Sequence, residues 1–200
     1  MKKPGGRRRL WWAWLALVLL GGSALALNPL ATFNLLMPKD RASVRLAEGL
    51  AYGRHDRQRL DIYAPRRRDA LLPVVIFFYG GGWEKGTRSG YGFAARAIAA
   101  QGFLVVVPDY RLVPEVRFPD FLRDCAEAVR WSRRHVARYG GDADRIVLLG
   151  HSAGAYNAAM LAFDPRWLGA ERTKIRGVVT LSGPFDFLPL EDRAAIEASG

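Results

Sequence analysis

The run Gly150-His151-Ser152-Ala153-Gly154 has the residue types and spacing best suited to chemistry. It follows the apolar residues 145–149 and precedes an alanine-rich stretch, so it marks a predicted strand-to-helix junction. Glycines on either side allow the sharp backbone turn that exposes a serine hydroxyl above a sheet edge. The helix that follows directs free N–H groups toward an anion formed there. The pattern predicts nucleophilic attack by Ser152 on an acyl carbon.

A glycine-rich loop supplies the second half of that chemistry. Residues 73–79 form a nearly continuous apolar run, typical of a strand buried on both faces, and end in Gly80-Gly81-Gly82-Trp83. Bare glycine amides can turn toward a ligand where side chains would block them. We expect the N–H groups of Gly81, Gly82 and Ala153 to hold the oxyanion that the attack creates.

The residues beside these two motifs are candidates for the pocket wall, namely Tyr79, Trp83 and His151. The competing interpretation of the two motifs is a glycine-rich turn and an unrelated helix cap at Ser152. The order of strand, glycine-rich loop, strand and serine turn favours the catalytic interpretation. The segment 109–111, Asp-Tyr-Arg, is either part of the pocket floor or a buried polar tie between loops, and we favour the tie.

With these motifs in place, the chain from about Glu48 onward resembles the α/β-hydrolases of the carboxylesterase and lipase group. Its glycine-rich loop is most similar to that of the bacterial esterase-like subgroup that reads H-G-G-G-W, with Tyr79 standing where the histidine would be. The other shared runs are LDIYAP at 60–65, VPDYRL at 107–112, YGGD at 139–142 and LSGPFD at 181–186. The resemblance implies an α/β fold with a mainly parallel sheet covered by helices on both faces. It also implies ester hydrolysis without a cofactor or a metal, and a bracing role for position 79.

One element of that chemistry is missing from the sequence. Such enzymes present their triad in the order serine, acid, histidine, yet the histidines here are His55, His135 and His151. His151 adjoins the serine and points elsewhere, and Asp186, after the strand at 175–181, is an acid expected near the catalytic edge. We count six strands against the family's eight, which predicts that the last strands are missing and that the chain is a C-terminally truncated fragment. Without the triad's acid and histidine, this polypeptide should be nearly inert by itself.

The N-terminus carries an export signal or a membrane anchor over residues 1–27. Five cationic residues precede an apolar run from Leu10 to Leu27 that is interrupted only by Gly21, Gly22 and Ser23. Residues 24–26 fit a cleavage site, whereas the length of the run and the tryptophans beside the arginines fit a transmembrane helix. Either interpretation places the protein in the cell envelope, membrane-anchored, periplasmic or secreted. Residues 28–45 are a predicted linker and residues 46–200 the incomplete hydrolase domain.

The distribution of charge limits the kinds of partner expected for this protein. The net charge is +11, but apart from Arg66-Arg67-Arg68 the excess beyond the leader is scattered, without the basic and aromatic stripe of a nucleic-acid site. Attraction of that run to anionic lipid headgroups remains open. The expected partner is a small-molecule ester; an amide-cleaving, formamidase-like activity is the nearest variant. The alternative of another class is a catalytically silent, membrane-anchored binding module of the same fold.

The order of elements predicts how the site is assembled. Strands are expected near 46–52, 59–64, 73–79, 103–107, 145–149 and 175–181, with helices near 91–101 and 118–138 and a further helix after Ser152. The single Cys125 is expected to pack inside the long helix. In such sheets, sites form where parallel strands end, so the glycine-rich loop and Ser152 should converge there.

Overall fold

The computed structural model describes residues 11–12, 32, 34, 36–38, 40–186 and 196–198. The chain divides into two compact units, Met1–Pro38 and Lys39–Gly200, and the second carries the sheet and the site. The predicted leader lies almost entirely outside the described residues. Within the parts that are described, no helix has the length and apolar character needed to cross a membrane.

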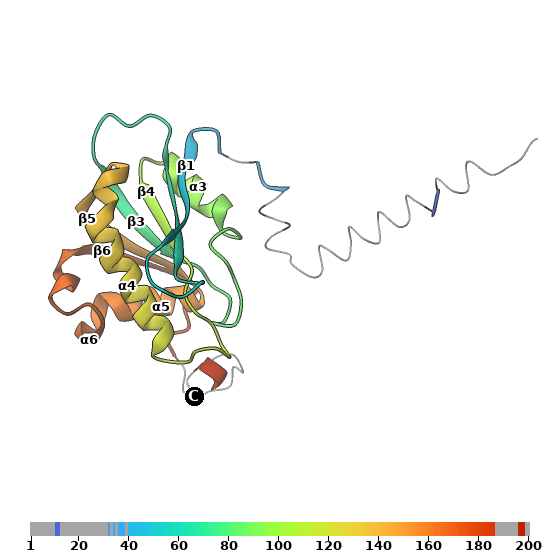
Figure 1. Ribbon diagram of the computed structural model, residues 1–200, viewed down its shortest axis with the longest axis vertical. Coiled ribbons are helices and arrows are strands. Elements are labelled where there is room, and N and C mark those ends of the chain that lie inside the picture. The colour runs from blue at the N-terminus through green and yellow to red at the C-terminus, as the bar shows by residue number, and fades with distance from the viewer. Residues whose placement is uncertain are drawn as a thin grey trace, which may run out of the picture. The chain divides into compact units, whose positions relative to one another are not determined.

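A six-stranded mixed sheet forms the centre of the second unit (Figure 1). Its strands are β1 (Ser43–Ala51), β2 (Arg59–Pro65), β3 (Leu72–Phe78), β4 (Leu104–Pro108), β5 (Gly141–His151) and β6 (Ile175–Leu181). They lie in the order β1-β2-β4-β3-β5-β6. The first two are antiparallel to their neighbours, whereas β4, β3, β5 and β6 run parallel. The predicted mainly parallel α/β sheet is confirmed.

Helices connect the parallel strands and cover the sheet. They are α3 (Gly92–Ala100), α4 (Asp120–His135), α5 (Ala153–Phe163) and α6 (Pro165–Leu168), with 3-10 turns at Val136–Tyr139 and Gly169–Lys174. The connection through α3 moves from β3 toward one side of the sheet, whereas those through α4 and α5 move toward the other. Because such crossovers are almost always right-handed, the two directions place α3 on one face and α4 and α5 on the opposite face.

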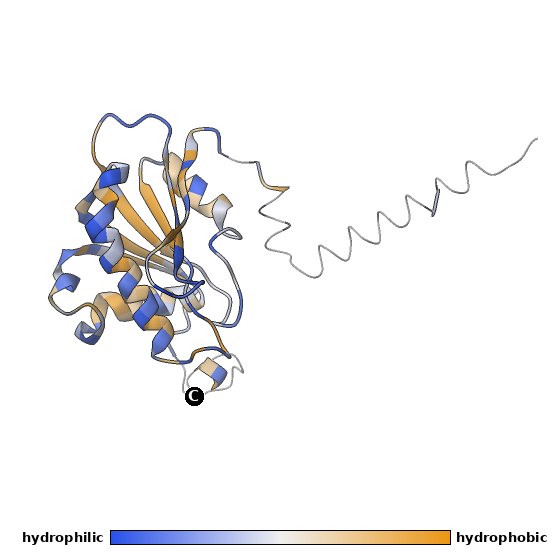
Figure 2. Ribbon diagram, in the orientation of Figure 1, coloured by the Kyte–Doolittle hydropathy of each residue, from blue (hydrophilic) through white to orange (hydrophobic). Residues whose placement is uncertain are grey.

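The core lies between these layers. The central strands β3 and β4 are apolar and the outer sides of the helices are largely polar, as Figure 2 shows. Helix α4 buries the predicted side of Phe121, Leu122, Cys125 and Val129, and Val136 is buried just after it. Fully buried residues of β3 and β4 require this cover on both faces, because a parallel strand has no solvent side. The predicted packing of Cys125 is confirmed.

Strand β6 differs from the other parallel strands. Among the described residues it pairs only with β5, and Val179 and Leu181 are 44% and 49% exposed. Apolar side chains on a strand of a parallel sheet are normally covered. The β6 edge is therefore an open, partly apolar edge of the described sheet.

Two strands begin three or four residues before their predicted starts. Strand β1 begins at Ser43 rather than 46, because Ser43 pairs with Pro65 and the N–H of Arg66 donates to the carbonyl of Ala42. Strand β5 begins at Gly141, four residues early, because Gly141 pairs with Leu72 before a register shift. Backbone pairing sets where both strands begin, and the hydrophobic pattern of the sequence does not indicate this pairing.

Candidate active site

Ser152 occupies the turn between β5 and α5. Its backbone, at φ 52° and ψ −123°, lies where residues other than glycine are rarely found, and such strain is typical of functional positions. The N–H of Ser152 donates to the Leu181 carbonyl at 2.8 Å, and its carbonyl accepts from the N–H of Ala155 at 2.8 Å. The side chain is half-buried and makes no capping hydrogen bond to α5. The turn is thus held by the backbone, which leaves the hydroxyl out of the helix cap.

The two flanking glycines are required by close packing. A Cβ at Gly150 would lie 2.1 Å from the carbonyl oxygen of Gly154, and a Cβ at Gly154 would lie 2.1 Å from that of Phe78. No side chain fits at either position. The absence of side chains therefore lets the start of α5 lie directly against the end of β3, where the glycine-rich loop begins.

That loop contacts the serine turn. A Cβ at Gly80 would lie 2.8 Å from the Cβ of Ser152 and 2.9 Å from Nδ1 of His151. Both distances are shorter than real Cβ contacts, so the Gly80 backbone already touches the two residues. The structure brings together the two motifs that the sequence separates by about seventy positions.

Backbone donors are available in the same region. In the described part of the chain, the N–H groups of Gly81 and Gly82 donate no hydrogen bond, while the Gly81 carbonyl accepts from the N–H groups of Glu84 and Lys85. Gly81 has φ 142° and Gly82 has φ 62°, and a Cβ at Gly81 would lie 2.0 Å from the Lys85 carbonyl oxygen. Ala153 is the first residue of α5, so its N–H has no preceding helical turn to bind. These amides are free to bind an anion.

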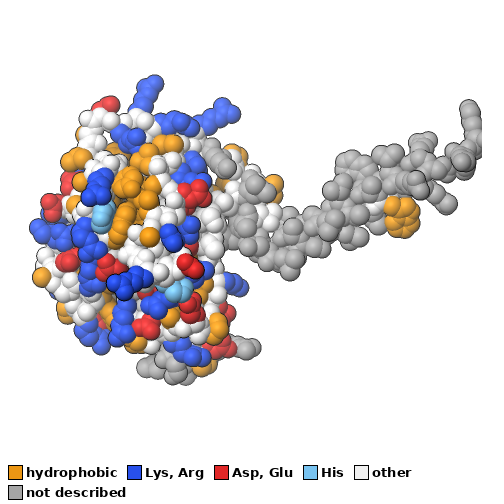
Figure 3. All heavy atoms as spheres, viewed as in Figure 1, with side chains coloured by type: hydrophobic (Ala, Val, Ile, Leu, Met, Phe, Trp, Pro, Cys, Tyr) orange, Lys and Arg blue, Asp and Glu red, His pale blue; other side chains and the backbone are white. Residues whose placement is uncertain are grey.

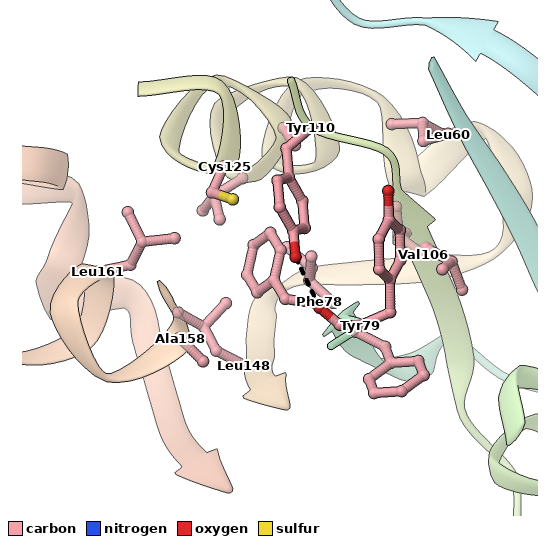
Figure 4. Packing of buried hydrophobic residues seen from close by; sticks show 14 of the residues in the cluster. Leu60, Phe78, Tyr79, Val106, Tyr110, Cys125, Leu148, Ala158 and Leu161 are labelled. Atoms are coloured by element: carbon pink, nitrogen blue, oxygen red, sulfur yellow. Dashed lines mark hydrogen bonds between the residues drawn. The ribbon is translucent and has the colours of Figure 1, made fainter. Parts of the chain in front are cut away.

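Tyr79 fixes the start of the loop from inside the core. Its hydroxyl donates to Oδ1 of Asp109 at 2.7 Å and accepts from Nη2 of Arg57 at 3.1 Å. Its ring stacks on Tyr110 at 5.0 Å, and the Tyr110 hydroxyl donates to the Tyr79 carbonyl (Figure 4). Burial, and then the charge of Asp109, raise the pKa of Tyr79, so the phenol stays a donor. Sequence reasoning also placed Tyr79 in the pocket wall, but its side chain is fully buried.

Arg88 fixes the far end of the loop. Its Nε donates to Oδ1 of Asp61 at 2.8 Å, its backbone N–H donates to Oδ1 of Asp109 at 2.6 Å, and its Nη1 pairs with Oδ2 of Asp109. The two carboxylates are only 1% and 5% exposed, and their pairing with Arg88 offsets the cost of burying charge in the interior. Asp109 therefore joins the two ends of the loop, and the buried polar tie expected for 109–111 is what the structure shows.

Trp83 anchors the middle of the loop. It is 3% exposed, its Nε1 donates to Oδ1 of Asn157 on α5 at 3.0 Å, and its ring packs on Phe121 and Tyr156. The indole therefore lies between α4 and α5. The sequence made Trp83 a candidate for the pocket wall, whereas in the structure the two helices cover its indole.

The three histidines lie apart from the serine hydroxyl. His55 accepts the N–H of Arg57 at Nδ1, so its Nε2 carries the proton and bonds Glu115. His135 stacks on Trp131 and bonds its carbonyl. Nδ1 of His151 is buried beside Gly80 and has no hydrogen-bond partner among the described residues. None of the three bonds Ser152 within the described part of the chain. Asp186 is exposed and follows β6 at the carboxyl edge.

Sequence reasoning missed four residues that hold the loop, namely Arg57, Asp61, Arg88 and Asn157. One signal was present: Asn157 is the lone amide in an otherwise apolar or small-residue helix, one turn after the serine. Arg57 and Arg88 lie in polar turns, where charged residues are ordinary, and Asp61 lies on β2 between two other strands. Their partners come from distant segments, which local patterns do not indicate.

A protein family and several known proteins are similar to this chain. The family model BD-FAE matches residues 60–199. A probable isoprenylcysteine alpha-carbonyl methylesterase of Oryza sativa is 38% identical over 117 residues, which is 58% of this chain and 28% of that protein. Esterase LipC of Mycobacterium tuberculosis is 35% identical over 157 residues, 73% of this chain and 38% of that protein. The chain thus spans well under half the length of these relatives.

Solved structures of esterases are also similar to this chain. The structure of an inhibited esterase B from Lactobacillus rhamnosis superposes with a TM-score of 0.74 at 25% identity, covering 93% of this chain and 64% of that one. The family match covers more than half of this chain. The chain therefore belongs to the BD-FAE family of carboxylesterase-like α/β-hydrolases.

Proposed function

We propose that this protein hydrolyses small carboxylic esters with Ser152 as nucleophile and the N–H groups of Gly81, Gly82 and Ala153 as the oxyanion hole. The observation that carries the proposal is the contact between the strained serine turn and Gly80, beside amides with no other partner. A strained serine is costly to keep, and donors that are unused in the resting protein are what a developing oxyanion needs.

The reaction follows from this arrangement. The Ser152 oxygen attacks the acyl carbon, and the negative charge that moves to the carbonyl oxygen is stabilised by the three amides. Collapse of the tetrahedral intermediate expels the alcohol and leaves an acyl-serine, which water then hydrolyses. Because the loop is clamped by Tyr79 and Arg88, its amides need little reorganisation during the attack.

The proton of Ser152 needs a base, and we assign it to a histidine, with its acid, outside these 200 residues. The three histidines of this chain are bonded elsewhere or directed at the glycine loop. The open β6 edge offers a place for further strands that would carry the pair toward Ser152. The 200 residues alone then keep only the contribution of the oxyanion hole, and lose several orders of magnitude in rate.

A fluorophosphonate probe tests this proposal on the protein translated through the continuing reading frame. Ser152 should be labelled, and Ser152→Ala should abolish both labelling and hydrolysis of a short-chain nitrophenyl ester. Ser182→Ala is the matched control, because Ser182 also has a positive φ, 50°, and follows the neighbouring strand β6. A folded protein that is not labelled would instead indicate the silent binding module, and turnover of anilides over esters would indicate the amide-cleaving variant.

We also propose that residues 1–27 direct export of the protein. Its cationic head and apolar run would export the domain, as a cleaved signal or as an anchor. Mass spectrometry of the N-terminus distinguishes the two: a first residue near Leu27 means cleavage, and Met1 means an anchor. A protein found in the cytoplasm with Met1 intact would contradict both.

A further inference from the structure

The ends of the parallel strands that lie away from Ser152 carry an unusual number of cations. This amino edge includes the start of β1, the end of β2 and the first residues of β3, β5 and β6. Its exposed cations are Arg41, Arg66, Arg67, Arg68, Arg138, Arg145, Lys174 and Arg176. Figure 3 shows basic side chains extending beyond this end of the domain, where the β2–β3 connection lies in Figure 1.

Hydrogen bonds join these segments into one surface. Nε of Arg66 donates to the carbonyl of Arg41, and Nη2 of Arg145 donates to the carbonyl of Leu71. Nε of Arg176 donates to the carbonyl of Asp144, one residue before Arg145. The eight cations are therefore not scattered, although the sequence spreads them over more than 130 positions.

The amino edge is also poorly neutralised. The acids exposed or half-exposed along it are Asp40, Asp69, Asp142 and Asp144, half the number of the cations. Two of them pair with Arg145 and Lys174. Within the described residues, no ion pair involves Arg67, Arg68 or Arg138.

The carboxyl edge differs, because two of its arginines, Arg88 and Arg111, serve the interior. Arg88 binds Asp61 and Asp109, and Arg111 binds Asp124 with both Nε and Nη2. Those acids are buried, so these arginines are already used for folding. Of the eight cations at the amino edge, the six other than Arg145 and Lys174 have no ion pair among the described residues, whereas the carboxyl edge, where the candidate site lies, has the exposed cations Arg54, Lys85 and Arg117 in that state.

We propose that the amino edge docks on the surface of a bilayer that contains anionic lipids. Three observations favour a lipid surface over a nucleic acid. The cations form a broad edge rather than a groove, the aromatic residues described at this edge, Phe103 and Tyr139, are half-buried against the core, and Leu71 stands among the cations 56% exposed. An apolar residue within a basic patch suits the headgroup boundary.

The direction of the chain agrees with this docking. The polypeptide enters β1 at the amino edge, from a sequence with a basic head and an apolar run. The seven residues of β3 separate this edge from the glycine-rich loop by about 20 Å. A domain docked in this way would keep Ser152 open toward the aqueous phase. The docking surface lies away from the candidate active site, so docking and the proposed hydrolysis are tested independently.

The test uses the full chain with a polarity-sensitive dye on Leu71→Cys, in vesicles of phosphatidylcholine with or without phosphatidylglycerol. The native Cys125 is buried and will not react. Asp56→Cys, in the β1–β2 turn at the carboxyl edge, is the matched dye position. Quenching by spin-labelled lipid should appear at position 71 only, should require phosphatidylglycerol, and should disappear at high salt.

The decisive variant is Arg67→Gln/Arg68→Gln/Arg138→Gln, because these side chains make no ion pair among the described residues and their loss should not affect folding. At about fivefold for each arginine, the ratio of docked to undocked protein should fall by roughly 100-fold. The charge-matched control, Arg54→Gln/Arg117→Gln/Arg123→Gln, changes the carboxyl edge and should leave docking intact.

Three results would overturn the proposal. Equal quenching in neutral vesicles would mean that the leader alone brings the domain to the lipid. An equal loss in both triple variants would mean that net charge acts without a docking surface. Displacement of the lipid by duplex DNA at physiological salt, through the same three arginines, would identify a nucleic-acid surface instead.

Discussion

Replacing Gly80 by alanine tests the contact on which the candidate site depends. The φ of Gly80 is not in the left-handed region, so the backbone itself accepts alanine. The added methyl would lie 2.8 Å from the Cβ of Ser152 and 2.9 Å from both Nδ1 and the carbonyl oxygen of His151. The shortest contact is 0.6 Å below the 3.4 Å at which ordinary contact begins. One of the three atoms is backbone, so the loop must move away from the serine.

That displacement has two measurable costs. Overpacking of this kind lowers the free energy of unfolding by about 1–3 kcal/mol. A shift of somewhat less than 1 Å in the oxyanion donors should reduce kcat by about 10- to 100-fold, since a misplacement of about 1 Å costs about 100-fold. KM should change less, because the donors act mainly on the transition state.

The assay combines urea unfolding with ester turnover by the protein of the continuing reading frame. Gly177→Ala is the control, since a Cβ there would meet only Cγ2 of Val147 at 3.9 Å. The control should match the native protein in both measurements. Our interpretation of the site would be refuted if Gly80→Ala kept the native kcat and the stability of the Gly177→Ala control.

Three further outcomes are expected. Ser152→Gly should raise the free energy of unfolding by about 1 kcal/mol or more, because glycine relieves the positive φ, while labelling disappears; a loss of stability would contradict the strain. Tyr79→Phe should lower the free energy of unfolding by about 1–3 kcal/mol, because buried Asp109 loses a hydrogen-bond donor. The denaturant midpoint of this variant is compared with those of Phe→Leu changes elsewhere in the core, since Tyr79→Trp is not a suitable control. Stability should fall as pH rises above 9 and more steeply above 10, because burial raises the pKa of the Cys125 thiol and of Tyr79 above their ordinary values, and the unfolded chain ionises first. The slope is about 1.4 kcal/mol per pH unit for each group, and Cys125→Ala should remove the part that begins near pH 9; a flat profile to pH 11 would exclude the mechanism.

The sequence predicted the fold well because the information is local and repetitive. Each buried parallel strand is a short run of apolar residues, as at 73–79 and 103–107, and the alternation with helices implies a parallel sheet. The serine turn was equally readable, since Gly150 and Gly154 are dictated by close packing. The strand ends were harder to predict. The first residues of β5 belong to the strand because Gly141 pairs with Leu72, and the hydrophobic pattern of the sequence does not indicate this pairing.

The residues that hold the glycine-rich loop in place were not predicted, for a different reason. Arg88 acts through carboxylates that lie on β2 and after β4, and Trp83 acts through an amide on α5. Each partner is separated from the loop by many residues, so only the folded sheet brings them together. Trp83 was assigned to the pocket wall because its true partners, on two helices, cannot be inferred from the loop.

Strand β6 has no second neighbour among the described residues, and this has a consequence for the behaviour of the protein in solution. A row of backbone donors and acceptors beside Val179 and Leu181 is a template for any other extended chain. Two copies related by a twofold axis would meet there as antiparallel strands and form one continuous twelve-stranded sheet, twice the six described here. Concentrated solutions should therefore self-associate, with the like charge of +11 per molecule as the main opposing force, so added salt should promote aggregation rather than dissolve it.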